Sequence, residues 1–157
     1  MRHDRPSKEI VLAQVAGVIS QRSTCQRRRV GCVIANELGW ILSTGYNGIA
    51  RGLPHCSENN PCPGVNAVSG TELDACFATH AEQSAIAQLR FPLEAFALIT
   101  TTSPCISCVK LILITSIRYI IYINEYPQPT AKELWLKNPG RYWIALNQLD
   151  AISIFKS

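Results

Sequence analysis

Residues 97–124 read ALITTTSPCISCVKLILITSIRYIIYIN, and this stretch decides the architecture that the sequence predicts. The run 97–101 indicates a short buried strand. Residues 105–115 suit a helix, with Pro104 just before its first turn, where the missing N–H of proline costs nothing. Residues 119–123 are rich in β-branched and aromatic side chains, which favour a second strand. The stretch therefore predicts a strand, a helix and another strand in succession.

The flanking sequence extends this alternation in both directions. Ser7 is a suitable N-cap for a helix that reaches about Gln21, and residues 30–36 and 40–46 predict an antiparallel hairpin. The other expected elements are helices at 73–89, 130–137 and around 143–148, and a last strand at 152–155. Helices that alternate with strands after a hairpin predict an α/β fold in three layers, α/β/α. Its sheet is mostly parallel after the first strands and carries helices on both faces.

The size and composition of the chain limit the class of protein. Its 157 residues fit one domain, 1–157, with a cysteine-rich insertion at about 47–77. A chain that is 47% hydrophobic and 17% charged is too apolar to be disordered. No apolar run reaches the roughly 20 residues of a membrane span, and the first residues lack the apolar stretch of a signal peptide. We therefore expect a cytoplasmic protein, in the host cytoplasm if the chain is viral.

The formal net charge of +4 bears on the partners. It permits anionic ligands such as nucleotides but is too small to indicate binding to long nucleic acid. The basic residues cluster at Arg27-Arg28-Arg29, which suits either a phosphate site or a solvated turn. Seven cysteines in a chain without a secretion signal point to metal binding or catalysis rather than to disulfides.

The pattern with the clearest chemical meaning joins His80-Ala81-Glu82 to Pro104-Cys105-Ile106-Ser107-Cys108. Cys105 and Cys108 lie on one face of the predicted helix, so both thiolates reach the same ion at the helix N-terminus. His80 supplies a third ligand from the facing helix. Three protein ligands leave one tetrahedral position open, which is typical of a catalytic zinc.

Glu82 follows a ligand by two positions and is therefore close to the metal without binding it. Zinc lowers the pKa of a water molecule toward about 7. Glu82 would take that water's proton and pass it to a ring nitrogen, and in a second transfer it would protonate the leaving ammonia. Taken separately, a helical histidine, a Cys-x-x-Cys pair and a helical glutamate each have ordinary structural explanations. Together they form H-x-E…P-C-x-x-C, a pattern of zinc deaminases that act on nucleobases.

Four further cysteines surround the long central segment, which has too few apolar residues to order itself: Cys25, Cys56, Cys62 and Cys76. Four thiolates are what a closed structural zinc site needs, so we expect a second zinc there, with His55 as a substitute ligand. The alternative is a set of scattered reduced thiols. Cys32, within the first predicted strand, is interpreted as a small core residue.

These residues resemble the deoxycytidylate (dCMP) deaminase family over about residues 7–127. The resemblance extends beyond the metal pattern to Arg22-Ser23-Thr24-Cys25, Val30-Gly31-Cys32-Val33-Ile34, Ser43-Thr44-Gly45-Tyr46-Asn47-Gly48 and Arg51-Gly52-Leu53-Pro54-His55-Cys56. It implies the cytidine deaminase-like fold, with a five-stranded mixed sheet between helices. It also implies hydrolysis of dCMP to dUMP and ammonia, which supplies dUMP for dTMP synthesis.

The resemblance further implies a homo-oligomer, commonly a hexamer, activated by dCTP with Mg²⁺ and inhibited by dTTP. It implies that Asn47 contacts the substrate sugar and that Ala81 and Tyr126 lie at the nucleotide. The four central cysteines look like the extra zinc site of some members. A triphosphate effector needs basic side chains, for which Arg27, Arg28 and Arg51 are the candidates. The sequence departs from the family pattern at Ala50, at Ser84, at Ser116 and beyond Tyr126.

Two other classes of function are compatible with the zinc pattern. One is a deaminase of another cytosine or adenine nucleoside or nucleotide, although a tRNA-binding enzyme would carry a broader basic surface. The other is a catalytically silent zinc module that senses nucleotides or docks a partner, which would have no need of the proton carrier Glu82. A purely structural zinc protein leaves the open coordination position unexplained.

Overall fold

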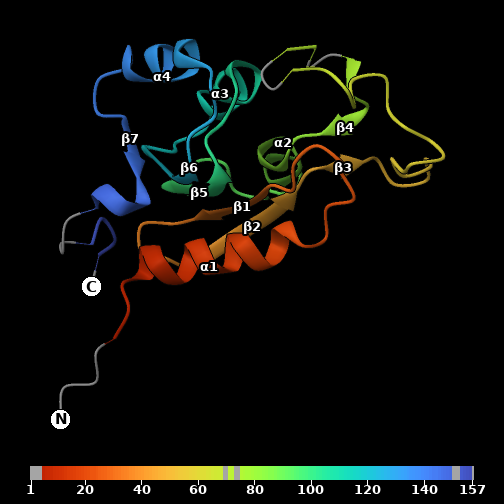
Figure 1. Ribbon diagram of the computed structural model, residues 1–157. Coiled ribbons are helices and arrows are strands. Elements are labelled where there is room, and N and C mark those ends of the chain that lie inside the picture. The colour runs from red at the N-terminus through yellow and green to blue at the C-terminus, as the bar shows by residue number, and fades with distance from the viewer. Residues whose placement is uncertain (1–4, 69–70, 73–74, 150–152, 157) are drawn as a thin grey trace.

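The computed structural model describes residues 5–68, 71–72, 75–149 and 153–156. Within these residues a five-stranded sheet lies between two layers of helices (Figure 1). The helices are α1 Lys8–Ser20, α2 Ala81–Ala87, α3 Ile106–Ile112 and α4 Pro129–Leu136, with a short 3₁₀ helix at Leu146–Gln148. The strands are β1 Gly31–Ala35, β2 Ile41–Tyr46, β3 Gly48–Ile49, β4 Ala78–Thr79, β5 Ala97–Thr102, β6 Tyr119–Asn124 and β7 Tyr142–Ala145.

The main sheet has the strand order β2-β1-β5-β6-β7. β1 pairs antiparallel with both β2 and β5, whereas β5, β6 and β7 run parallel. The sheet is therefore mixed, with an antiparallel hairpin at one edge and helix-connected parallel strands beyond it. The predicted three-layer α/β fold, with its five-stranded mixed sheet, is confirmed.

The two faces of the sheet build two separate cores because alternate strand residues point to opposite sides. Val33 and Ala35 of β1 pack with Leu12 and Ala16 of α1 on one face. Cys32 and Ile34 face the other side, which is covered by α2, α3 and α4. Figure 1 shows this arrangement, with α1 on one side of the sheet and α2, α3 and α4 on the other. Trp135 of α4 is completely buried in the second core.

The first helix begins where the sequence predicts. The Ser7 hydroxyl accepts a hydrogen bond from the Ile10 amide at 3.3 Å, as an N-cap does. Inside the same helix, Glu9 is buried and its carboxylate accepts from the Ser153 hydroxyl at 2.6 Å and the Ile154 amide at 2.7 Å. The C-terminal segment is thereby fastened to α1, with Phe155 in the core on that face.

Two predicted helices are wrong in extent or in kind. Of the helix expected at 73–89, residues 73–74 lie outside the described residues, and the helix that is present is Ala81–Ala87, because Ala78–Thr79 pairs as a strand with Gly48–Ile49. The first half of the helix expected around 143–148 belongs to the edge strand Tyr142–Ala145, in keeping with the strand preference of its aromatic and β-branched residues, and the second half is the 3₁₀ helix Leu146–Gln148. Of the last strand expected at 152–155, residue 152 lies outside the described residues and 153–155 form no strand.

The cysteine-rich insertion leaves and rejoins the body of the protein at one place. β3 and β4 form a separate two-stranded antiparallel sheet, with Gly48 opposite Thr79 and Ile49 opposite Ala78. Between them, the described residues contain turns and one isolated bridge, Ser57 to Asn60. Among the described helices, none is both long and apolar enough to cross a membrane.

Candidate active site

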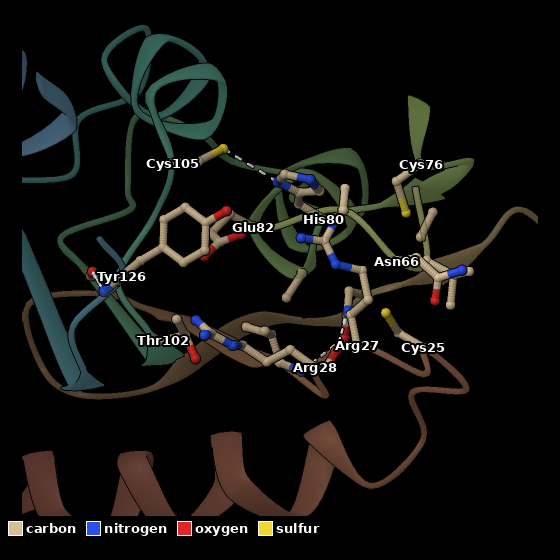
Figure 2. A pocket seen from close by; sticks show the side chains of 17 residues that line it. Cys25, Arg27, Arg28, Asn66, Cys76, His80, Glu82, Thr102, Cys105 and Tyr126 are labelled. Atoms are coloured by element: carbon tan, nitrogen blue, oxygen red, sulfur yellow. Dashed lines mark hydrogen bonds between the residues drawn. The ribbon is translucent and has the colours of Figure 1, made fainter. Parts of the chain in front are cut away.

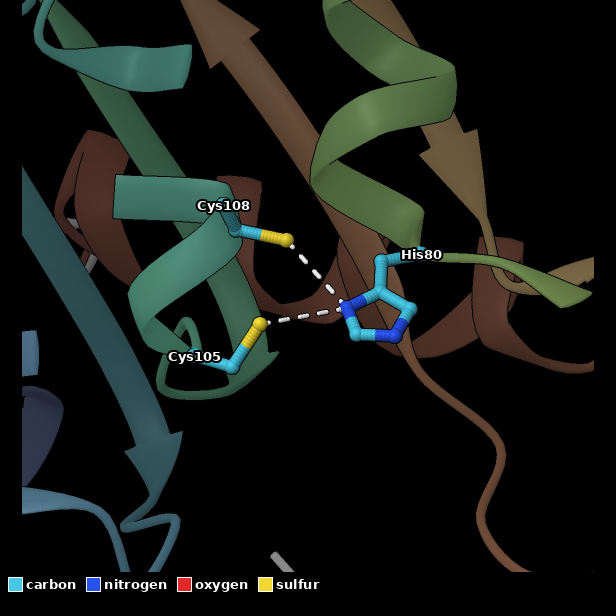
Figure 3. A group of neighbouring side chains, drawn as sticks. All are labelled: His80, Cys105 and Cys108. Atoms are coloured by element: carbon cyan, nitrogen blue, oxygen red, sulfur yellow. Dashed lines mark hydrogen bonds between the residues drawn. The ribbon is translucent and has the colours of Figure 1, made fainter. Parts of the chain in front are cut away.

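Three predicted metal ligands meet where α2 and α3 begin. His80 is the N-cap of α2, Cys105 is the N-cap of α3, and Cys108 lies in the first turn of α3. His80 Nδ1 is 3.3 Å from Cys105 Sγ and 3.3 Å from Cys108 Sγ. Figure 3 shows both sulfur atoms directed at the imidazole ring. The sequence predicted this convergence, although it placed His80 inside a helix rather than at its start.

The geometry of this group fits a zinc ion. One ligand atom from each of His80, Cys105 and Cys108 lies within 4.8 Å of the other two. Atoms bound to a tetrahedral zinc at about 2.0–2.3 Å are roughly 3.5 Å apart, close to the separations seen here. Among the described residues, no other group of three such side chains is gathered in this way. Both cysteines are buried, so the protein can hold the ion with little solvent access.

The Glu82 carboxylate lies beside this group. Glu82 is 4% exposed, its Oε2 is 3.4 Å from Cys108 Sγ, and its Oε1 accepts from the Thr100 hydroxyl at 3.4 Å. Burial is the largest cause that raises the pKa of Glu82 above its usual value. A carboxyl group whose pKa is raised binds a proton more readily than an exposed one, which suits a general acid–base.

Packing against β2 fixes the position of α2. A Cβ on Gly45 would collide with the backbone of Ala81 and Ala85, so only glycine allows the helix to lie this close to the sheet. The Gln83 side chain accepts the backbone N–H of His80 at 2.8 Å, which fixes the start of the helix. The His80 and Glu82 side chains are therefore directed toward α3 by close backbone contact.

The start of α3 is fixed in a comparable way. The Gln128 side chain, from the segment after β6, accepts the backbone N–H of Ile106 at 2.6 Å. The Tyr126 amide donates to the Ser103 hydroxyl at 2.7 Å. Both contacts tie the segment after β6 to the turn that carries Cys105. The start of α2 is thus held against β2, and the start of α3 is held by the segment that follows β6.

The two thiol groups differ in how readily they give up a proton. Hydrogen bonding from Cys108, followed by that from His80, lowers the pKa of Cys105 to about 4. The same contact with Cys105 raises the pKa of Cys108, and burial adds to this effect. The hydrogen bond with Cys105 is also the main cause that raises the pKa of His80. The group thus already holds one thiolate, the form in which cysteine binds metals.

A cavity of about 360 Å³ opens in front of the group (Figure 2). That volume lies within the roughly 300–1,000 Å³ typical of small-molecule sites. His80, Glu82 and Cys105 line its inner part, and Tyr126 and Arg28 line it from neighbouring segments. The cavity therefore brings a small ligand to the carboxylate and the ligand group together.

Most of the residues predicted to contact substrate or effector line this cavity. Asn47, Ala81 and Tyr126 all line it. Both polar atoms of the Asn47 side chain contact the chain itself, which leaves its predicted contact with the sugar as a prediction. Of the proposed effector arginines, Arg27 and Arg28 line the same cavity, whereas Arg51 is exposed in a turn after β3 and does not.

The four cysteines of the predicted second site lie in one neighbourhood. Cys62 Sγ is 3.9 Å from Cys76 Sγ, and the Cys62 amide donates to Cys56 Sγ at 3.4 Å. Cys25 joins these three around a cavity of about 10 Å³. His55 contacts the Thr24 hydroxyl at 3.3 Å. Cys32 is completely buried in the core, as interpreted from the sequence.

Sequence reasoning missed two contributors to the site. Thr100 is buried and its hydroxyl lies between Glu82 and the Thr102 carbonyl. Its one signal was the threonine run in a strand that leads to Pro104. Residues 65–67 of the cysteine-rich insertion also line the cavity. Nothing local in the sequence marked them, because their position depends on how the insertion folds back.

The geometry agrees with comparisons to known proteins. Residues 6–124 match the family model of the cytidine and deoxycytidylate deaminase zinc-binding region. The chain belongs to this family. Its member from Schizosaccharomyces pombe, a deoxycytidylate deaminase, is 36% identical over 78% of this chain, but this chain spans only 38% of that protein's length. The deoxycytidylate deaminase of Mycobacterium phage D29 is 32% identical over 77% of this chain and 98% of its own length.

A solved member of the family has the same overall fold. The dCMP deaminase of cyanophage S-TIM5, in complex with dCMP and dUMP, is similar with a TM-score of 0.72 and 26% identity. The match covers 92% of this chain and all of the phage protein. The fold of this family is thus present here, together with a His/Cys/Cys group that can hold zinc.

Proposed function

We propose that the chain catalyses the zinc-dependent hydrolytic deamination of dCMP to dUMP and ammonia, which supplies dUMP for dTMP synthesis. The observation that carries this proposal is the buried Glu82 carboxylate, 3.4 Å from one sulfur of the three-ligand group, at the inner end of a cavity. Deoxycytidylate deaminases among the relatives, and the phage enzyme bound to dCMP and dUMP, support the choice of substrate.

The residues of the site have separate roles in this reaction. A zinc ion held by His80, Cys105 and Cys108 would supply a Lewis acid that makes a water molecule a better nucleophile. Glu82 accepts one proton of the attacking water and delivers it to the ring nitrogen. It then takes the second proton of that water, from the hydroxyl group now on the ring carbon, and passes it to the amino group, which leaves as ammonia. Thr100 donates to Oε1 of Glu82 and keeps the carboxylate directed at the reacting carbon.

A substrate panel tests this function directly. Ammonia release is measured with the zinc-loaded protein and dCMP, dCTP, cytidine or adenosine. We expect the highest kcat/KM with dCMP. A rate with dCMP no higher than with the other three would reject the proposed substrate, and ammonia release from none of them would favour the catalytically silent module.

We also propose a second, structural zinc at Cys25, Cys56, Cys62 and Cys76. The contact between Cys62 and Cys76 and the small cavity that all four line support this site. A closed Cys₄ site would also order a segment that has few apolar residues of its own. Elemental analysis should find two zinc ions per chain, and a value of one would contradict the proposal.

Control by dCTP with Mg²⁺ and by dTTP, assembly into a hexamer and a cytoplasmic location are proposals supported by the family resemblance. Arg51, exposed and outside the catalytic cavity, is the candidate for an effector contact. We expect dCTP with Mg²⁺ to raise, and dTTP to lower, the rate at subsaturating dCMP. Light scattering measures the oligomer, and a monomer would exclude the hexamer.

A further inference from the structure

Thr100 places a hydroxyl group in a completely buried part of the sheet. The residue lies on β5, opposite Cys32 of β1 and beside Tyr122 of β6, and it is 0% exposed. Valine has nearly the same shape as threonine without the polar group, and a buried hydroxyl group costs free energy unless it is hydrogen-bonded. Any advantage of threonine over valine at this position therefore comes from its polar contacts.

Two acceptors lie within reach of the single hydroxyl proton of Thr100. One is the Thr102 carbonyl at 2.9 Å, and the other is Oε1 of Glu82 at 3.4 Å. A hydroxyl group donates one hydrogen bond and accepts others. It can therefore donate to Oε1 while Glu82 is a carboxylate. If Oε1 carries a proton, the hydroxyl group can accept from it and donate to the Thr102 carbonyl, so Oε1 keeps the same partner in both forms.

The other oxygen of Glu82 lies beside the predicted metal ligands. Oε2 is 3.4 Å from Cys108 Sγ, close to the roughly 3.5 Å between two atoms bound to one tetrahedral zinc. Glu82 nevertheless lies outside the three-ligand group. Carboxylate oxygens bind zinc well, and a fourth protein ligand would close the position that a catalytic zinc keeps open. The site therefore needs a contact that holds this carboxylate away from the ion.

The contact between Glu82 and Cys108 cannot serve this purpose once a metal is bound. Without metal, the Cys108 thiol donates to Oε2 of Glu82. Cysteine binds metals as the thiolate, which has no proton to donate. Among the side-chain hydrogen bonds of the described residues, the one from Thr100 is then the donor that remains for Glu82.

We propose that Thr100 is a positioning residue that keeps Glu82 a proton carrier and prevents it from becoming the fourth ligand of the catalytic metal. Its hydroxyl group holds Oε1 against β5. The carboxylate is thereby kept from turning toward His80 and Cys105, and Oε2 is left to carry the proton. The inference rests on the proposed function, since it gives a physical cause for the open coordination position on which that reaction depends.

The test uses the full chain with cobalt(II) in place of zinc, because the visible absorption of cobalt(II) depends on its ligands. Azide is the probe, since it binds the metal where a coordination position is open and shifts the absorption. The proposed second site, with four thiolates, has no open position and should not respond.

The variants are Thr100→Val, Thr100→Ala, Thr100→Ser and the double variant Thr100→Val/Glu82→Ala. Thr115→Val is the matched control, because Thr115 is also buried and its hydroxyl group contacts Ile112 and Ile117 rather than Glu82. The zinc-loaded forms give kcat and KM with dCMP. Thermal unfolding reports whether each variant is folded, and the alanine variant provides the same comparison if the valine variant does not fold.

We expect azide to shift the absorption of the parent, of Thr100→Ser and of Thr115→Val alike. In Thr100→Val and Thr100→Ala the Kd for azide should rise about tenfold or more, because the released carboxylate competes for the open position. With zinc, the same two variants should have a kcat lowered roughly 10–100-fold and a KM for dCMP within about threefold of the parent. The double variant should regain the azide response, because it lacks the competing ligand.

Three results would overturn the role of Thr100. One is a Thr100→Val protein with the azide affinity of the parent, whatever its kcat. Another is a loss of azide binding that persists in the double variant, which would indicate a distorted metal site. The third is a parent protein that does not respond to azide. Failure of the proposed function is distinguishable, since a chain that releases no ammonia from dCMP would still show the effect of Thr100 on azide binding.

Discussion

The protein uses cysteine in two regions that are built very differently. Cys105 and Cys108 lie at the start of α3, are at most 5% exposed, and face His80 across a buried core. Cys25, Cys56, Cys62 and Cys76 lie in or beside a segment whose described residues form turns rather than helices or strands. The comparison indicates that packing builds the catalytic group in advance, whereas the order of the insertion would depend on the proposed second zinc.

Removing the proton carrier should have the largest effect and should leave the catalytic metal in place. We expect Glu82→Gln to lower kcat with dCMP by about 10²–10⁴-fold, the usual contribution of general acid–base catalysis. Zinc content, measured by elemental analysis, should not change because Glu82 is not among the three ligands. Glu94→Gln, at an exposed loop position, is the control and should keep full activity.

Cys62→Ser tests whether a metal orders the cysteine-rich insertion. If a metal orders the insertion, this variant should lose about one zinc per chain, and its Tm should fall by roughly 5 °C or more, equivalent to about 2 kcal/mol in a chain of this size. Cys32→Ala is the matched control, because it removes a buried thiol that belongs to neither group. Unchanged zinc content in Cys62→Ser would show that the insertion is ordered without metal.

A pair of glycine variants tests the claim that packing positions the catalytic group. Gly45→Ala places a methyl group against the backbone of α2 and should destabilise the fold by about 1–3 kcal/mol, with a lower kcat. Gly17→Ala, inside α1 with nothing within 4 Å of the new methyl, should instead stabilise by about 0.5–1 kcal/mol. Urea unfolding measures both, and equal effects would contradict the close contact at Gly45.

The smallest expected effect is on the thermal stability of the metal-free protein. Burial raises the pKa of Glu82, so the folded state binds this proton more tightly than the unfolded chain does. The carboxyl group therefore costs stability as the pH rises above its unfolded pKa of about 4.5, and the cost disappears below that value. Metal-free Glu82→Gln should have a Tm a few degrees above the parent at pH 7 and equal to it near pH 4. No difference at pH 7 would contradict the raised pKa.

The same contrast explains what the sequence could predict. Residues 97–124 and the hairpin at 30–46 have local hydrophobic patterns that determine their structure, and all of those strands are present. The extent of α2 was wrong because Ala78 and Thr79 are recruited by a distant pair, Gly48 and Ile49, which no local pattern reveals. No local pattern reveals that residues 65–67 form part of the cavity wall either.

The site was predictable to the extent that its chemistry depends on ligand spacing. His80, Glu82, Cys105 and Cys108 follow from one motif and lie together. The effector role of Arg27 and Arg28 stays a prediction, because a basic run gives no information about which cavity it faces. The place of Arg28 beside Tyr126 depends on Asn47, a partner at the far end of the hairpin. The division of the chain into a single domain with an insertion stays a prediction.

The pairing of β3 with β4 has a consequence for variation among related proteins. Since Gly48 stands opposite Thr79, the intervening segment starts and finishes at adjacent points. The entropic cost of closing a loop between two such adjacent points changes only slowly with the length of the loop. Homologues could therefore trim, extend or exchange this module without displacing the helices behind it. Because residues 65–67 reach back to the cavity, each such exchange would reshape the entrance through which the ligand passes.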